Sequence, residues 1–170
     1  MNSIEQRQGK NVAAFRNRDF MYLWSMTGFG LLFNDPRIPA KLLALDESAK
    51  DIGVAVVQAL SESTVLTSES FQEIFRSGEI LKKGNEWDGY LIKKYGYRSS
   101  KGLYKHMHKC TISEVGESIS FSPSLHDDLE SWSGISAAED VVLPSTSSSE
   151  EIGLALLEAF NRCNDAWSAP

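Results

Sequence analysis

Histidine and cysteine alternate in the stretch HMHKC, the first place where the chain could do chemistry. Side chains two residues apart share one face of a strand, so His106, His108 and Cys110 would lie side by side. Both residue types bind zinc, and His126 follows downstream. No CxxC or HxxxH partner accompanies them, however, and Cys110 begins a face that we expect to be buried. The pattern favours packed or solvated histidines, and we predict no metal ligands and no cofactor.

A second candidate chemistry is hydrolysis. Ser124, His126 and either Asp127 or Asp128 supply the residue types of a hydrolase triad. They are crowded into one short segment, no strand–turn–helix elbow presents the serine, and no oxyanion donors are evident. We therefore predict no catalytic residues and no enzymatic activity.

A third candidate is nucleic-acid binding through residues 93–109. This stretch holds six basic residues and no acidic one, interleaved with Tyr95, Tyr97 and Tyr104. Aromatic rings among basic side chains hold single-stranded nucleic acid, so a small nucleic-acid-binding protein is the alternative function. The same pattern also fits a solvated helix end whose tyrosines pack inward. Residues 110–170 carry 1 basic and 11 acidic residues, a net charge of −10 that would repel phosphate, so we expect no direct contact with nucleic acid.

Length and composition fit an ordinary globular protein. With 170 residues, 42% hydrophobic and 24% charged, we expect one domain over residues 1–170, with a frayed start or a short helix over 1–18 and a frayed end over 164–170. No apolar run approaches the ~20 residues of a membrane span, and the N-terminus lacks the apolar core of a secretory signal. The predicted location is the cytoplasm, away from membranes, where Cys110 and Cys163 would be reduced thiols packed as small apolar groups.

The stretch from Cys110 to Gly134 must position the candidate residues. Apolar and polar side chains alternate in CTIS and again in SISFS, which predicts two half-buried strands joined at Gly116. Pro123 has no N–H for a ladder and is predicted to end the second strand. The remainder, SPSLHDDLESWSG, is predicted to be an irregular loop that hangs from this hairpin and carries the function.

Two decapeptides match at a spacing of 100 residues: DIGVAVVQAL (51–60) and EIGLALLEAF (151–160). Each places its apolar side chains on one helical face and has a serine, Ser48 or Ser148, placed to cap the helix. A glycine inside a helix costs about 1 kcal/mol against alanine, so its recurrence suggests a close backbone approach to a sheet. A shared docking mode, an internal duplication and a coincidence of two amphipathic helices all remain open.

These elements predict an α+β fold in a single domain. We expect a mostly antiparallel or mixed sheet of about five strands, flanked by about four helices. The strands are 20–26, 29–33, 108–114, 117–122 and 140–143, the first two forming a hairpin that turns at Gly28 and Gly30, and the helices are 48–63, 68–77, 84–95 and 149–163. The predicted core comprises Ile52, Val56, Leu60, Ile112, Ile119, Phe121, Leu156 and Phe160.

Three segments, in this order and spacing, carry a family resemblance: YGYRSSKGLYKHMHKCTI, SISFSPSLHDDLESWSG and VVLPSTSSSEEIGLALLEAFNRC. They resemble the immunity proteins of bacterial contact-dependent growth inhibition. The resemblance covers roughly residues 90–163. Its most specific part is F-S-P-S-x-H-D-x-L-E-x-W-S-G, from Phe121 to Gly134, which we call the signature segment.

The resemblance implies a cytoplasmic, non-enzymatic protein that binds and blocks the C-terminal toxin domain of a cognate exported effector, commonly a nuclease. In some members of this family a toxin β-hairpin enters a pocket and extends the immunity protein's sheet, which is a known recognition mode. An acidic C-terminal third independently suits a basic nuclease surface.

Two sets of residues are candidates for partner binding and for support of the signature segment. The exposed acids expected to meet the toxin are Asp127, Asp128, Glu130, Glu139 and Asp140. The residues expected to be mainly structural are Ser122, Pro123, His126 and Trp132. Residues 64–89, which fall outside the resemblance, are expected to carry part of the specificity.

Overall fold

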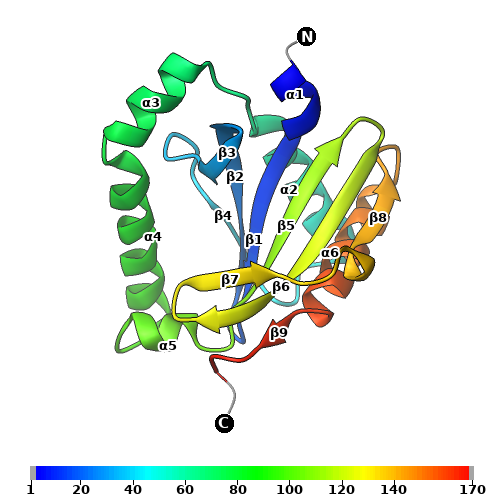
Figure 1. The fold of residues 1–170 in the computed structure, drawn as a ribbon. Coiled ribbons are helices and arrows are strands. Elements are labelled where there is room, and N and C mark those ends of the chain that lie inside the picture. The colour runs from blue at the N-terminus through cyan, green and yellow to red at the C-terminus, as the bar shows by residue number, and fades with distance from the viewer. Residues whose placement is uncertain (1–2, 169–170) are drawn as a thin grey trace.

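The computed structural model describes residues 3–168, in which helices cover both faces of a curled sheet (Figure 1). The helices are α1 (Ser3–Gln8), α2 (Ala49–Glu62), α3 (Ser68–Arg76), α4 (Glu79–Tyr95), α5 (Ser100–Tyr104) and α6 (Ser149–Asn161), with a short turn η1 (Ala137–Glu139). The strands are β1 (Lys10–Arg16), β2 (Met21–Phe29), β3 (Leu31–Asn34), β4 (Lys41–Leu43), β5 (His108–Val115), β6 (Ser118–Asp128), β7 (Ser131–Gly134), β8 (Val141–Pro144) and β9 (Asn164–Asp165).

The α+β class is confirmed, but the described part of the chain has nine strands rather than about five and six α-helices rather than about four. The sheet runs in the order β3-β2-β1-β5-β6-β7, with β4 paired to β2 and both β8 and β9 paired to β6. All pairings between these strands are antiparallel except the short β6–β9 pair. The strands missed from the sequence are β4, β7, β9 and, above all, β1.

Helix α1 confirms the predicted short helix within residues 1–18, but the sequence did not predict the strand β1. This strand lies in the middle of the sheet, antiparallel to β2 on one side and β5 on the other. Val12 and Ala14 belong to the core beneath α2 and α6, whereas Ala13 and Phe15 belong to the core on the opposite face. A strand buried on both faces loses the polar–apolar alternation by which a strand is recognised.

The two matched helices, α2 and α6, cover one face of the sheet and pack on each other. A Cβ placed on Gly53 would lie 1.7 Å from the carbonyl oxygen of Ser149, and one on Gly153 would lie 1.8 Å from that of Ala49. Each glycine therefore admits the first turn of the other helix. The predicted close backbone approach exists, but it joins helix to helix and not helix to sheet.

Both helices begin as the sequence predicted. The Ser48 hydroxyl accepts the backbone N–H of Asp51 at 3.1 Å, and the Ser148 hydroxyl accepts that of Glu151 at 3.2 Å. All eight predicted core residues are buried. Helix α4 begins at Glu79, earlier than the predicted 84. Gly78 takes the left-handed conformation at the N-cap, so the helix starts directly after it.

The central hairpin has the predicted register, since Ile112 faces Phe121 and both Ile119 and Phe121 are buried. The predicted end at Pro123 is wrong, because β6 continues to Asp128. Pairing of β6 with β8 reaches only Phe121, and pairing with β7 begins at Ser124. Pro123 thus lies between the part of β6 that pairs with β8 and the part that pairs with β7, and its pairing partner is Cys110 of β5.

Two further corrections concern the hairpin at the sheet edge and the C-terminus. The β2–β3 hairpin exists as predicted, but β2 extends to Phe29 and the turn lies at Gly30 alone. Residues 164–168, predicted to fray, are attached to the sheet: β9 pairs with β6, and the backbone N–H of Trp167 donates to the His126 carbonyl at 3.1 Å. Within residues 3–168, none of the helices has the length and apolar character of a membrane span.

The reciprocal glycine contact predicts a specific sensitivity. Gly53→Ala should lower the free energy of unfolding by about 1–3 kcal/mol, because a methyl group must displace the backbone of Ser149. Gly89→Ala in α4 is the matched control, since its Cβ meets nothing within 4 Å and alanine gains roughly 0.5–1 kcal/mol in a helix. Urea unfolding measures both, and equal stability of the two variants would contradict the packing.

Candidate partner-binding cleft

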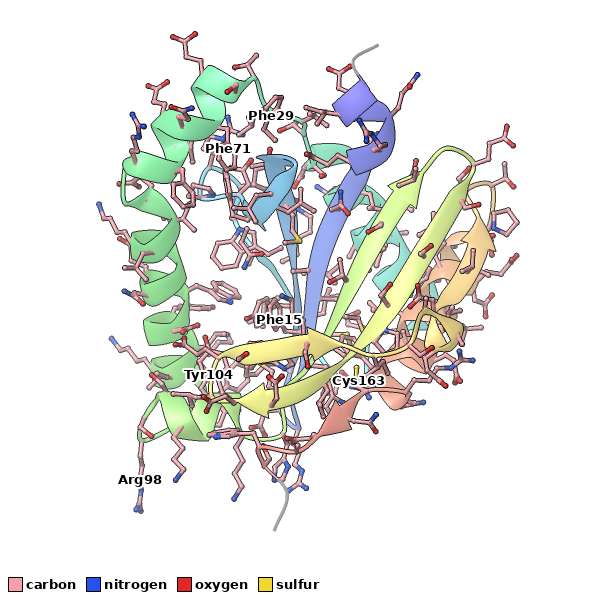
Figure 2. All side chains as sticks on the ribbon, viewed as in Figure 1. Phe15, Phe29, Phe71, Arg98, Tyr104 and Cys163 are labelled. Carbon is pink, nitrogen blue, oxygen red and sulfur yellow. The ribbon has the colours of Figure 1, made fainter. Side chains whose placement is uncertain are left out.

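An aromatic cleft of about 420 Å³ lies between the sheet and the α3–α4 arm, next to β7. Figure 2 labels Phe15 on the sheet and Tyr104 beside the lower end of α4, at two sides of this region. Strand alternation builds the sheet wall, because β2 turns Tyr22 and Trp24 toward the cleft and Met21 and Leu23 toward the other core. The cleft is lined by Phe15, Tyr22, Trp24, Asn34, Phe75, Gly78, Ile80, Leu81, Gly84, Asn85, Trp87, Asp88, Tyr104, Glu130 and Trp132.

The aromatic rings of the cleft brace one another. The Trp87 ring meets those of Tyr22 and Trp24 at centroid distances of 5.4 and 6.0 Å, both at an interplanar angle of 71°. The Phe15 and Trp132 rings meet at 5.5 Å and 76°. Edge-to-face contacts of this kind stabilise defined ring orientations, so the wall is formed before any partner binds.

Two carboxylates, Asp88 and Glu130, enter this aromatic surrounding. The Tyr104 hydroxyl donates to Asp88 at 2.6 Å. Burial raises the pKa of Asp88, the Glu130 charge raises it further, and the hydrogen bond from Tyr104 acts in the opposite direction. Across residues 3–168, no lysine, arginine or histidine forms an ion pair with either acid. The cleft therefore carries negative charge without a cation.

The signature segment forms one rim of the cleft. It is not an irregular loop as predicted, because β6 and β7 form a hairpin in which His126 faces Trp132. Their rings stack at 4.6 Å, and the buried His126 also has Nε2 3.1 Å from the Leu129 carbonyl oxygen. The Trp132 indole N–H donates to the Met107 carbonyl at 3.1 Å. The stacked His126 thus holds the two strands of the hairpin together, and Trp132 ties the hairpin to Met107, just before β5.

Comparison with known proteins gives this arrangement a family. The family model for CdiI, described as the CDI immunity protein, matches residues 10–163. The chain belongs to this family. It is 30% identical over 161 residues to the immunity protein CdiI-YPIII of Yersinia pseudotuberculosis serotype O:3 (strain YPIII), covering 86% of this chain and 91% of that protein.

Two solved structures share the fold of this CDI immunity protein family member. A protein of unknown function, NMB0488 from Neisseria meningitidis, matches with a TM-score of 0.87 and 30% identity over 96% of this chain and 100% of the other. A CdiA-CT/CdiI toxin and immunity complex from Yersinia pseudotuberculosis matches with a TM-score of 0.83 and 27% identity over 91% and 97% of the two chains.

The five predicted partner-binding acids do not form one group. Asp127, Asp128 and Glu130 lie together at the tip of the β6–β7 hairpin, and Glu130 lines the cleft. Hydrogen bonding to Ser133 lowers the pKa of the exposed Asp127. Glu139 and Asp140 lie beyond the other end of β7, at η1, on the side of β8 and α6 (Figure 1).

The four predicted structural residues all lie on the β6–β7 hairpin. His126 is fully buried and Trp132 half-buried against it, as described above. Ser122 is half-buried opposite Thr111, and Pro123 is buried opposite Cys110.

The residues considered for catalysis and metal binding are engaged elsewhere. The Ser124 hydroxyl donates to the Lys109 carbonyl at 2.6 Å and not to His126. His106 precedes β5 with a φ of +59°, so it leaves the strand face that it was predicted to share with His108 and Cys110. No group of three or more histidine, cysteine, aspartate or glutamate residues within 3–168 is arranged to hold a metal ion.

The tyrosines of the basic stretch pack inward, which is the alternative to nucleic-acid stacking. Tyr95 stacks on Phe20 with ring centroids 4.6 Å apart. The Tyr97 hydroxyl donates to Asp19 and accepts from the Asn17 amide, and Tyr104 binds Asp88. These rings are therefore part of the fold.

Sequence reasoning missed the cleft itself. The strand over residues 20–26 and the helix that contains Trp87 were predicted, but Asp88 received no role. The available signal was the spacing of Tyr22 and Trp24, because side chains two residues apart share one face of a strand and therefore predict an aromatic face on the sheet. Nothing in the sequence placed Asp88 of α4 in the same cleft as Glu130, because their approach depends on the tertiary fold.

The signature segment yields a stability prediction. Trp132→Ala should lower the free energy of unfolding by about 2–4 kcal/mol, because the ring contacts Phe15, Tyr104 and His126 and its N–H binds Met107. Ser131→Ala, on the exposed neighbour, is the control and should stay within about 0.5 kcal/mol of wild type. Chemical unfolding checks both. Wild-type stability with lost protection against a toxin would instead assign Trp132 to partner contact.

Proposed function

We propose that this protein binds the C-terminal toxin domain of its cognate contact-dependent growth inhibition effector and blocks it without catalysis, in the cytoplasm. Membership of the CDI immunity protein family and the fold match to a toxin and immunity complex support this assignment. The observation that carries the site is the aromatic cleft with two carboxylates that have no cationic partner within the described chain.

The chemistry of the cleft favours a basic segment of the toxin. A desolvated carboxylate is costly unless a cation compensates it, and residues 3–168 provide no ion-pair partner for Asp88. Aromatic rings beside the acids would add cation–π attraction, most effectively to the planar guanidinium of arginine. We therefore propose that the toxin is a nuclease, since a protein that binds nucleic acid must display basic side chains toward phosphate.

The free edge of β7 supports strand addition as the geometry of binding. β7 is the terminal strand in the order β3-β2-β1-β5-β6-β7 and pairs only with β6 among the strands of residues 3–168. Its unpaired N–H and C=O groups can accept an extended toxin strand. Trp132, on β7, lines the cleft, so a strand added to this edge would approach the aromatic wall.

Acids next to the cleft and farther along the same part of the chain would guide the approach. Asp127 and Asp128 stand at the hairpin tip beside Glu130, and Glu139 and Asp140 extend the acidic surface beyond β7. Complementary charge at a rim acts mainly on the association rate and on its salt dependence. We assign Ser122, Pro123, His126 and Trp132 a mainly structural role, because they belong to the hairpin that displays Asp127, Asp128 and Glu130.

Specificity between toxins is proposed to reside largely in residues 64–89. This range contributes Phe75, Ile80, Leu81, Asn85 and Trp87 to the cleft, opposite the sheet wall. Changing these side chains alters the shape of the cleft without disturbing the hairpin β5–β6 or the paired helices.

Charge reversal tests the proposed function. Asp88→Asn combined with Glu130→Lys should weaken binding of the purified cognate toxin domain by about 10- to 100-fold and abolish protection of a susceptible bacterium. Glu117→Lys, on the exposed β5–β6 turn, is the control for a charge reversal away from the cleft and should bind like wild type. Titration calorimetry and a growth assay measure the effects. Failure of the wild-type protein to co-purify with any cognate toxin domain would refute the function, whereas unchanged affinity of the double variant would refute only the site.

A further inference from the structure

Two thiols from distant parts of the chain meet at the lower end of the sheet. Cys110 of β5 and Cys163, which follows α6, have their Sγ atoms 3.6 Å apart. Both are free cysteines; Cys110 is buried and Cys163 is half-exposed. Figure 2 labels Cys163 close to the strands of the central hairpin.

The surroundings of the pair favour reaction at Cys163. Its Sγ lies 3.4 Å from the Lys109 carbonyl oxygen and 3.5 Å from that of Ala159, so the side chain is held in one place. The guanidinium of Arg16 lies over the Phe160 ring at 4.7 Å, and its charge acts on both thiols. The hydrogen bond from Cys110 lowers the pKa of Cys163, helped by Arg16, whereas burial raises the pKa of Cys110. The half-exposed sulfur is therefore the better nucleophile.

We propose that Cys110 and Cys163 form an oxidative modification site, in which hydrogen peroxide converts the two thiols into an intramolecular disulfide. The Cys163 thiolate attacks one peroxide oxygen, the O–O bond breaks, and the departing hydroxide takes up a proton as water, leaving a sulfenic acid. The Cys110 sulfur then attacks the Cys163 sulfur, the S–O bond breaks, and the Cys110 proton leaves with the hydroxyl as a second water. Two thiols and one peroxide thus give one disulfide and two waters.

The two sulfur atoms are already close to bonding distance. A disulfide needs its sulfurs about 2.05 Å apart, so the present separation closes by roughly 1.5 Å, which side-chain rotation can supply. The partly exposed Cys163 admits a molecule as small as peroxide, while buried Cys110 meets no other thiol in residues 3–168. An internal bond is therefore favoured over a bond between two molecules.

The disulfide would close a loop around the whole signature segment. Cys110 pairs with Pro123 across β5 and β6, and Cys163 directly precedes β9, which pairs with Leu125 and His126. The bond would therefore fasten the end of α6 to β5, next to the strand β6 of the hairpin that borders the cleft. Closing a long loop restricts the unfolded chain, so the oxidised protein should be more stable than the reduced one.

The test treats the folded protein with hydrogen peroxide, using wild type and the variants Cys110→Ser and Cys163→Ser. Wild type should lose the mass of two hydrogen atoms, both titratable thiols and the separate peptides that contain residues 110 and 163. Its melting temperature should rise by roughly 5 °C or more and return on addition of dithiothreitol. Neither variant should show these changes, and circular dichroism confirms that each is folded.

Three results would overturn the proposal. The first is wild-type protein that keeps both thiols while its methionines are oxidised. The second is Cys163 that gains oxygen atoms while Cys110 stays a thiol, and the third is a disulfide between two molecules. If Cys110→Ser does not fold, Cys163→Ser alone decides the question. Its remaining thiol, Cys110, should stay reduced under the peroxide treatment that oxidises wild type. Toxin binding plays no part in this readout, so it is independent of the proposed function.

Discussion

Burial of β1 on both of its faces is the constraint on which the rest of the structure depends. Val12 and Ala14 require an apolar layer on one side, and Ala13 and Phe15 require one on the other. The first requirement is met by α2 and α6, whose glycines let the two helices approach until each fits the first turn of the other. That face is filled mainly by aliphatic side chains of the core beneath the two helices.

The second face of β1 is covered differently, and this difference leaves the cleft to which we assign partner binding. Aromatic side chains from β1 and β2 are covered by α4 along one side and by the β6–β7 hairpin at one end, which leaves a cleft between them. Large rings at an open edge retain exposed apolar surface, and the two carboxylates add negative charge that the chain does not neutralise. The mainly aliphatic face thus gives stability, while the aromatic face leaves the cleft that we propose for a basic partner.

The sequence was sufficient for elements whose signal is local. The alternation of Ile119 and Phe121 with serines specified the central hairpin and its register, and Ser48 and Ser148 located the starts of α2 and α6. The strand β1 was lost because burial on both faces removes alternation. β7 and β9 were lost because strands of four and two residues owe their existence to pairing with β6. The signature segment was found as a motif, but its conformation depends on the stacking of His126 on Trp132. The cleft could not be predicted, since Asp88 and Glu130 are brought together only by the tertiary fold.

The central claim is that the aromatic cleft and the β7 edge receive the toxin domain, and hydrogen–deuterium exchange with and without that domain tests it most directly. Binding should slow exchange at the amides of β7 and along α4, while amides in α2 and α6 keep the rates of the free protein. Slowed exchange across α2 and α6 with unchanged rates at β7 and α4 would contradict the account.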